Sequence, residues 1–302
     1  TTEIYTLSLH DALPISHGLN QPSKIGHGCE AAMSLPLWCQ ASSPDTTWTP
    51  VTPMFDFSNP QPQSLPAVFA HRGASRLHHE NTLEAFQAAV DLGVDGIEFD
   101  VRRTRDNVIV VHHNARVLRS SRWIKNLSYD EILGLAKRRG YHIPTLEETL
   151  RLCSGEVALD IELKEPGYER EVVALVRRWY NFHHVAFTSF RPAVVAALRV
   201  AAPRATIGLI VGTMAPTALR ARLRRGALTT RLRTIGADIV APHRHLVTSA
   251  FCKRMADEGL PIMTWTINRT AVARRLAQRG AAVIITDVPE RILPALRSMP
   301  KE

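Results

Sequence analysis

Residues 68–119 read VFAHRGASRLHHENTLEAFQAAVDLGVDGIEFDVRRTRDNVIVVHHNARVLR. An apolar, strand-like run ends in His71-Arg72-Gly73, an amphipathic segment covers Thr82 to Leu92, and a second strand-like run carries Glu98 and Asp100. Because side chains alternate along a strand, Glu98 and Asp100 share one face and apolar residues take the other. A strand with an acidic front is either a solvated edge or part of a site in which oxygen ligands hold a divalent cation.

From Pro66 onward, short apolar runs alternate with amphipathic segments, a pattern that predicts an α/β fold. Strands are expected at 67–70, 96–101, 108–112, 157–163, 184–189, 206–211, 237–241, 262–267 and 283–286. Helices are expected at 82–92, 129–137, 146–153, 169–180, 192–201, 216–225, 249–258, 271–279 and 289–297. The size and the alternation suit a (β/α)8 TIM-type barrel. Nine strand candidates compete for eight places, so one of them lies outside the barrel or is not a strand.

The connection between the second and third strands is irregular, because Arg102 to Asn107 is too short to hold a crossover helix. An antiparallel hairpin would fit. Six extended residues also reach roughly 20 Å, enough to cross a barrel wall without a helix and to return His113 to the end that carries Glu98 and Asp100. We favour this second arrangement.

Residues 1–64 have no sustained helical or strand period and are rich in Pro, Ser, Thr and Gly. This pattern is typical of a disordered leader. Its first stretch, EIYTLSLHDALPIS, resembles translated sequencing-adapter sequence, so part of the leader is expected to be artefactual. The sequence therefore predicts a leader over 1–64 and one barrel domain over 65–302.

The composition of the 302 residues, with 45% hydrophobic and 22% charged, is that of a soluble globular protein, and no run suggests a stable membrane insertion. The formal net charge of +9 suits an anionic partner. Much of the arginine lies in amphipathic helices without interleaved aromatic residues, so a small phosphate-bearing molecule is favoured over nucleic acid. Four cysteines without metal-type spacing argue against a disulfide framework, and no secretory signal opens the chain. We therefore expect a cytoplasmic protein; nothing indicates its oligomeric state.

In a barrel, chemistry takes place where the strands end. His71 and Arg72 follow the first strand, His113 closes the third, and the fourth reads ALDIELKE, in which Asp160, Glu162 and Lys164 share a face. Asp160 either supports a site from behind or packs within the barrel.

Several ionised carboxylates around one position are costly to bury unless a cation neutralises them. Oxygen ligands without cysteine or paired histidines indicate Ca²⁺ or Mg²⁺. Beside such an ion, two histidines can transfer protons while Arg72 and Lys164 face developing negative charge. This combination of carboxylates, histidines and cationic side chains suits an enzyme that transfers phosphoryl groups.

The chain also resembles the glycerophosphodiester phosphodiesterases, a family of phosphoinositide-phospholipase-C-like phosphodiesterase barrels. The resemblance extends from about Ala67 to Leu296. The matching stretches are HRG at 71–73, ENT-x-EAF at 80–86, G-x-D-x-IE-x-DV at 93–101, T-x-D-x-x-x-VV-x-H at 104–113, IPTLEE at 143–148, IELK at 161–164, SF at 189–190, WTIN at 265–268 and IITD at 284–287.

The resemblance implies a metal-dependent enzyme that hydrolyses glycerophosphodiesters, such as glycerophosphocholine or glycerophosphoethanolamine, to sn-glycerol 3-phosphate and an alcohol. The roles implied for this chain are metal binding by Glu98, Asp100 and Glu162, proton transfer by His71 and His113, phosphate binding by Arg72 and Lys164, a glycerol-pocket wall at Trp265, and an acid beside or behind the metal ligands at Glu80.

One departure concerns the residue after His113, where the family usually has aspartate and this chain has Asn114. If that residue only orients the histidine, asparagine can partly replace it; if its charge raises the histidine's basicity, activity should fall. A catalytically silent phosphodiester-binding barrel is therefore one alternative. A phospholipase-like activity on lysolipids, such as a lysophospholipase D, is another, although the short connection from Arg119 to Ile143 favours a small, water-soluble substrate. An arginine-driven nucleic-acid binder is a third.

Overall fold

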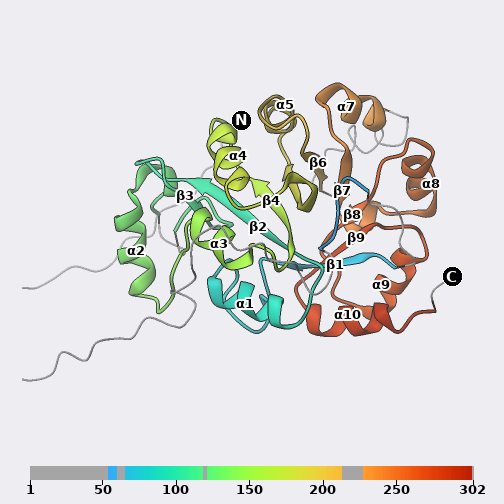
Figure 1. Ribbon diagram of the computed structural model, residues 1–302, viewed down its shortest axis with the longest axis horizontal. Helices are drawn as coiled ribbons and strands as arrows, with labels where there is room; N and C mark the ends of the chain where they lie inside the picture. Colours follow the sequence, from blue (N-terminus) through green and yellow to red (C-terminus); the bar gives the residue numbers. More distant parts are fainter. Residues whose placement is uncertain (1–53, 60–64, 118–120, 213–226, 301–302) are drawn as a thin grey trace, which may run out of the picture. The chain divides into compact units, whose positions relative to one another are not determined.

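The computed structural model describes residues 54–59, 65–117, 121–212 and 227–300. Within these ranges, eight strands are neighbours in the order β7-β6-β5-β4-β2-β1-β9-β8, and every pair is parallel. Single bridges from Val240 to Ile262 and from His243 to Trp265 join β7 to β8 and nearly close the sheet. The expected TIM-type barrel is confirmed, with helices around it (Figure 1).

The barrel strands are short runs of buried residues, as expected where helices cover a parallel sheet on its outer face. They are β1 Ala67–His71, β2 Gly96–Arg103, β4 Ala158–Leu163, β5 Val185–Ser189, β6 Thr206–Val211, β7 Ile239–Pro242, β8 Met263–Thr264 and β9 Val283–Thr286.

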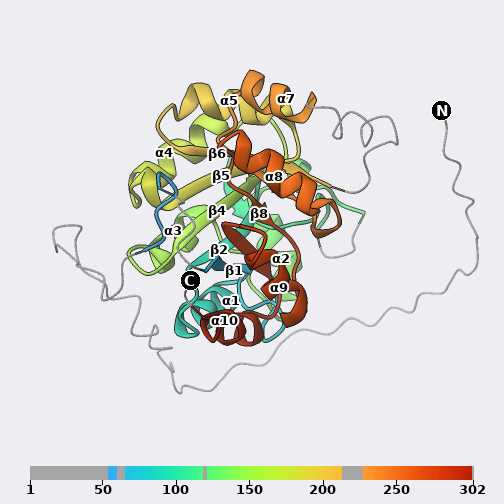
Figure 2. The ribbon, with the colours of Figure 1, turned by 90° about the vertical axis from the view of Figure 1, so that its right-hand side faces the viewer.

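Helices follow the strands and bury one apolar face each. The helices around the barrel are α1 Leu83–Asp91, α3 Leu146–Cys153, α4 Glu169–Arg177, α5 Pro192–Ala201, α7 Ala227–Ile235, α8 Ser249–Asp257, α9 Thr270–Ala277 and α10 Pro289–Arg297. Figures 1 and 2 both show α1 beside α10 and, on the opposite side of the barrel, α4, α5 and α7.

The segment between β6 and β7 contains a helix that the sequence pattern does not predict. In this helix, α7, Leu228 and Leu232 lie four residues apart and are both buried. The helix expected at 216–225 lies outside the described residues. None of the described helices combines the length and the apolar character that crossing a bilayer requires.

The link between the second and third strands is the antiparallel hairpin, so the predicted crossing of the barrel wall is wrong. β2 continues to Arg103, and β3 (Ile109–Val111) pairs with it antiparallel, Val101 opposite Val111. The hydroxyl of Thr104 bonds to Asp106, and Asn107 takes a positive φ of 64°, which closes the turn. β3 is therefore the ninth strand that has no place in the barrel.

The excursion that follows β3 has a small core of its own. It contains the 3-10 turn η2 (Ile124–Asn126) and the helix α2 (Tyr129–Lys137), which begins with a capping box between Ser128 and Glu131. Buried residues from β3, η2 and α2, including Val110, Ile124 and Ile132, form one apolar cluster. This cluster holds the excursion at one flank of the barrel (Figure 1).

The floor of the barrel is closed by aromatic rings. Phe57 is buried and lies edge-on to Phe55 and Phe69, with ring centroids 4.9 and 5.7 Å away. Its amide donates to the carbonyl of His183 at 2.7 Å. Residues 54–59, which the sequence analysis places in the leader, thus pack against the barrel, whereas 1–53 and 60–64 lie outside the described residues. The division at residue 64 remains a prediction.

Candidate active site

Strand register determines which side chains meet inside the barrel. His71 lies beside Glu98 across the β1–β2 pair. On the next pair, Glu98 lies beside Asp160 and Asp100 beside Glu162. Residues two apart along these strands face the same way, so the inward faces change from small or apolar side chains at the floor to ionisable ones at the carboxyl ends.

A cavity of about 340 Å³ opens at this end. One side is ionisable, with His71, Arg72, Glu98, His113, Asp160, Glu162 and Lys164. The other is apolar, with Phe190, Ile210, Ala241, Trp265 and Ile285. Phe190 and Trp265 meet edge to face with centroids 5.6 Å apart. The cavity can therefore hold a charged group on one side and a carbon skeleton on the other.

The three predicted metal ligands converge. One oxygen from each of Glu98, Asp100 and Glu162 lies within 4.8 Å of the others, and all three residues are buried. Two oxygens bound to one Ca²⁺ at 2.3–2.6 Å are at most about 5 Å apart. The spacing therefore suits a divalent cation.

The cluster carries more negative charge than its own cations offset. Burial and the neighbouring Asp100 and Asp160 raise the pKa of Glu98 well above its usual value. Burial raises the pKa of Glu162 to about 7, although Lys164 opposes the shift. Burial, aided by Glu162 and Asp100, raises the pKa of Asp160 to about 8 against a hydrogen bond from Thr188. A cation would favour the ionised forms of all these groups.

Asp100 is the exception, because it has two cationic partners. The ammonium of Lys164 lies 2.6 Å from Asp100 Oδ1 and 2.7 Å from Glu162 Oε1. Nε of Arg72 lies 3.2 Å from Asp100 Oδ2, and the amide of Asn81 donates to the same oxygen at 2.9 Å. Burial alone would raise the pKa of Asp100, but these two cations outweigh burial and lower it.

Arg72 is held by an unusual backbone. Its φ is +58°, and its amide donates to the carbonyl of Glu98 at 2.7 Å. Gly73 follows at φ +81°, where a Cβ would come within 2.6 Å of the backbone of Ala85, so only glycine fits. The guanidinium of Arg72 also donates to Glu80 at 2.9 Å. Glu80 thus supports Arg72 and is not one of the three clustered carboxylates.

His71 belongs to a chain of hydrogen bonds across the junction of β1 and β9. Its Nδ1 donates to Asp287 at 2.5 Å, and Asn268 donates to the other oxygen of Asp287 at 2.6 Å. Nε2 of His71 lies 3.8 Å from Glu98. Because Asp287 fixes Nδ1 as the donor, Nε2 is the nitrogen free to exchange a proton inside the cavity.

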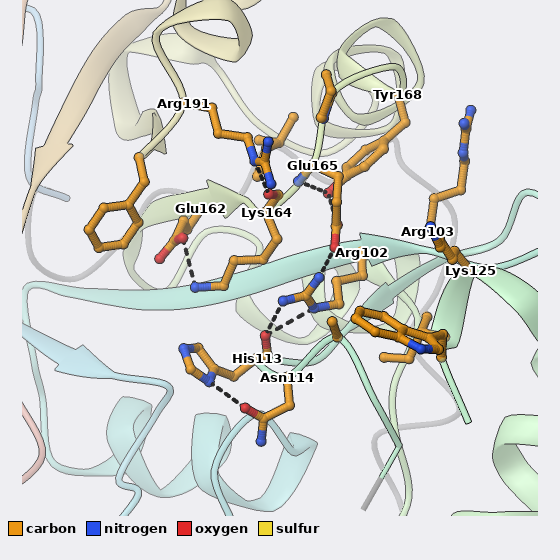
Figure 3. A pocket seen from close by; sticks show the side chains of 16 residues that line it. Arg102, Arg103, His113, Asn114, Lys125, Glu162, Lys164, Glu165, Tyr168 and Arg191 are labelled. Atoms are coloured by element: carbon orange, nitrogen blue, oxygen red, sulfur yellow. Dashed lines mark hydrogen bonds and ion pairs between the residues drawn. The ribbon is translucent and has the colours of Figure 1, made fainter. Parts of the chain in front are cut away.

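His113, and not its neighbour His112, faces the cavity. Nδ1 of His113 bonds to the side-chain oxygen of Asn114 at 3.2 Å (Figure 3). Arg102 donates twice to the His113 carbonyl, at 2.9 and 2.6 Å. Burial lowers the pKa of His113 to about 4, against the effect of Asp100. His112 is buried elsewhere, with Nε2 3.4 Å from the carbonyl of Arg116.

The predicted site residues thus lie around one cavity. Glu80 contacts Arg72 there, and Asn114 contacts His113. Four further residues contact this site without a role predicted from the sequence: Asn81, Phe190, Asn268 and Asp287. Each of them stands in a stretch that carries the family resemblance, but none has a neighbour in sequence that would indicate its partner.

A parallel barrel with carboxylates, two imidazoles and two cations at its carboxyl end has the site of a barrel enzyme that acts on an anionic substrate. Comparisons with known proteins agree. Residues 71–291 match the model of the glycerophosphoryl diester phosphodiesterase family. A glycerophosphodiester phosphodiesterase from Caldanaerobacter subterraneus is 31% identical over 249 residues, which cover 76% of this chain and 97% of that protein. The chain belongs to the glycerophosphoryl diester phosphodiesterase family.

Two solved structures share the fold. A glycerophosphodiester phosphodiesterase from Agrobacterium tumefaciens is 25% identical with a TM-score of 0.63, and the match covers 76% of this chain and all of that one. A phosphodiesterase from Oleispira antarctica, in complex with the product sn-glycerol-3-phosphate, is 24% identical with a TM-score of 0.66; the match covers 78% of this chain and 98% of that one. The expectation of a phosphodiesterase is confirmed.

Proposed function

We propose that this protein hydrolyses small glycerophosphodiesters to sn-glycerol 3-phosphate and an alcohol. The observation that carries the proposal is the convergence of three buried carboxylates, two imidazoles and two cations on one cavity. Family membership supports the same substrate class. We retain a cytoplasmic location as a prediction.

Glu98, Asp100 and Glu162 would hold one divalent cation, Ca²⁺ or Mg²⁺. The donor set is all oxygen, its spacing fits, and the pKa of Glu98 is raised by burial and by the neighbouring carboxylates Asp100 and Asp160, so a cation there would favour its ionised form. When bound, such a cation supplies positive charge that stabilises the charge developing on the phosphoryl group. Lys164, which contacts Asp100 and Glu162, also lines the cavity and could turn its ammonium toward a bound phosphodiester.

Arg72 and Lys164 would bind the phosphodiester oxygens, and Trp265 would contact the glycerol carbons. Arg72 is suited to this role because Glu80 and Asp100 fix its guanidinium from behind. Charge-assisted hydrogen bonds from two fixed cations also stabilise the transition state, since negative charge grows on the same oxygens.

The two imidazoles would serve opposite sides of phosphorus. His71, oriented by Asp287, would take the proton of the attacking hydroxyl, which is the glycerol 2-hydroxyl if a cyclic phosphate forms, or water if attack is direct. As the attacking oxygen bonds to phosphorus, the bond to the leaving alcohol breaks, and His113 would protonate the alcohol oxygen. If a cyclic phosphate has formed, water then opens it to give sn-glycerol 3-phosphate. Burial keeps His113 neutral in the free protein, so the arriving phosphodiester anion must raise its pKa for this role.

A direct test is the release of sn-glycerol 3-phosphate from glycerophosphocholine and glycerophosphoglycerol, with Ca²⁺, Mg²⁺ or EDTA. We expect cation-dependent product, loss of turnover in His71→Ala and His113→Ala, and unchanged turnover in a control at exposed His78, His78→Ala. Binding of the diesters without product under any cation would refute the proposal and favour the silent barrel.

A second measurement separates the two histidines. An activated nitrophenyl diester of glycerol phosphate has a leaving group that needs no proton. His113→Ala should therefore lose much less activity on this ester than on glycerophosphocholine, whereas His71→Ala should lose activity on both. Equal losses would overturn the assignment of His113 to the leaving oxygen. A search for a trapped cyclic phosphate distinguishes internal attack from direct hydrolysis.

A further inference from the structure

A second, larger cavity adjoins the catalytic one. Its volume is about 590 Å³, and four residues line both cavities: His113, Glu162, Lys164 and Phe190. We call it the outer groove; its remaining walls include Arg102, Arg103, Trp123, Lys125, Glu165 and Arg191. His113, assigned above to the leaving oxygen, lies where the cavities meet, so a leaving alcohol would extend into the outer groove.

The outer groove has an uncompensated positive charge. Its two carboxylates are already paired, Glu162 with Lys164 at 2.7 Å and Glu165 with Arg102. By contrast, Lys125 and Arg191 are exposed and have no carboxylate within 4.0 Å among the residues that the structure describes. Figure 3 shows Arg191 near Lys164 and Lys125 beside Arg103, with Arg102 and Glu165 between these two groups and His113 and Asn114 below them.

The aromatic wall of the outer groove does not favour a cationic ligand. Trp123 is 41% exposed, and an open indole could bind a quaternary ammonium. Here, however, the guanidinium of Arg116 lies 4.9 Å from the ring centroid and the ammonium of Lys125 lies 5.8 Å from it. These two cations already use the attraction of the ring, and they would repel a third.

We propose that the outer groove is the subsite for the leaving alcohol and that it selects alcohols carrying a phosphate group. Lys125 lies on η2 and Arg191 at the start of α5, so two separate elements present cations to the groove. The excursion after β3, whose short length favours a small, water-soluble substrate, supplies Trp123 and Lys125 to the outer groove. This inference rests on the proposed function and specifies its substrate class.

The test compares three glycerophosphodiesters whose leaving alcohols are choline, glycerol and glycerol phosphate, which differ chiefly in charge. We expect kcat/KM to be highest for glycerol phosphate and lowest for choline. The preference should shrink as salt is raised, because exposed charges are screened. A fourth substrate, in which the distal phosphate is itself esterified, shows whether the groove takes a terminal phosphate or one inside a longer chain.

Two variants locate the effect. Lys125→Ala and Arg191→Gln should each lower kcat/KM for the phosphate-bearing substrate by about fivefold, as expected for one exposed ion pair, and leave the glycerol substrate within about twofold. Lys253→Ala and Arg178→Gln are controls, because these cations are exposed and pair with Asp257 and Glu147, away from the groove. Neither control should change the ranking.

Affinity provides a readout that does not depend on turnover. Binding of the three diesters to His71→Ala, measured by calorimetry, should follow the same order. An absence of turnover in the wild type, with this order retained, would refute the proposed function and the role as a leaving-alcohol subsite, and leave only the preference of the outer groove for phosphate-bearing ligands. The inference alone would be refuted if kcat/KM for the choline diester equalled or exceeded kcat/KM for the glycerol phosphate diester. Equal effects of Lys125→Ala and Arg191→Gln on all three substrates would refute it as well.

Discussion

Asp160 offers the sharpest test of the idea that the barrel mouth holds excess negative charge. It is buried at the wall of the cavity, accepts a hydrogen bond from Thr188 at 2.7 Å, and lies beside Glu98 on the next strand. Asp160→Asn keeps the shape and the acceptor oxygen but cannot ionise. We therefore expect this substitution to stabilise the cation-free protein at pH 8 and to have little effect at pH 4.

The magnitude follows from proton linkage. The pKa of Asp160 is about 8 in the folded protein and about 3.8 when unfolded, so the folded state binds the proton more tightly. The free energy of unfolding of the wild type should therefore fall as pH rises from about 4 to about 8. At 1.36 kcal/mol per pH unit, the upper limit is about 6 kcal/mol. Because water reaches the open cavity and screens the carboxylate, we expect about 2 to 4 kcal/mol.

The assay is urea unfolding in EDTA at pH 5, 6.5 and 8. The advantage of Asp160→Asn should increase with pH over this window and shrink when a divalent cation is added, because the cation stabilises the ionised cluster. Asp257→Asn, at an exposed carboxylate on α8, is the matched control and should change stability by less than about 0.5 kcal/mol. An equal effect of Asp160→Asn at pH 5 and pH 8, or destabilisation at pH 8, would contradict the reasoning.

Three other substitutions address separate parts of the site. Asp287→Asn removes the charge that orients His71, so kcat should fall by about 10²- to 10⁴-fold with little change in KM, as steady-state kinetics would show. Unchanged kcat would mean that the hydrogen bond has no role in proton transfer. Asn114→Asp places a carboxylate beside His113; because a negative charge favours the imidazolium, the pKa of His113 should rise from about 4, and the basic limb of the pH–rate profile, along which the general acid loses its proton, should move to higher pH by about 1 unit. An unmoved limb would show that His113 does not govern it. Gly73→Ala forces a Cβ against the backbone of α1 at a positive φ and should cost about 3 kcal/mol or more in urea unfolding; a cost below about 1 kcal/mol would show that the turn relaxes.

Much of the barrel could be predicted because buried parallel strands appear as apolar runs, and because the helices between them carry apolar residues every three to four positions. The same alternation along a strand correctly predicts that Glu98, Asp100, Glu162 and Lys164 lie on inward faces. Both features depend on residues that are close together in the sequence, so a pattern along the chain is enough to predict them.

Sequence patterns failed where the structure depends on pairing between separate segments of the chain. Six extended residues after Val101 fit both a hairpin and a wall crossing, and the choice depends on backbone hydrogen bonds that β2 makes beyond the barrel rim. The bond from His71 to Asp287 joins residues 216 apart in sequence and exists only because β1 lies beside β9. No pattern along the chain indicates such a partner.

The aromatic rings beneath the barrel set a limit on shortening the protein. Phe55 and Phe57 cover Phe69, whose ring in turn lies where any side chain larger than hydrogen at Gly96 would have to go. A recombinant version trimmed to begin at β1 would leave Phe69 open to water and would lose the hydrogen bonds that residues 55–58 make to His183 and His184. Trimmed versions should therefore retain Phe55 if they are to stay monodisperse.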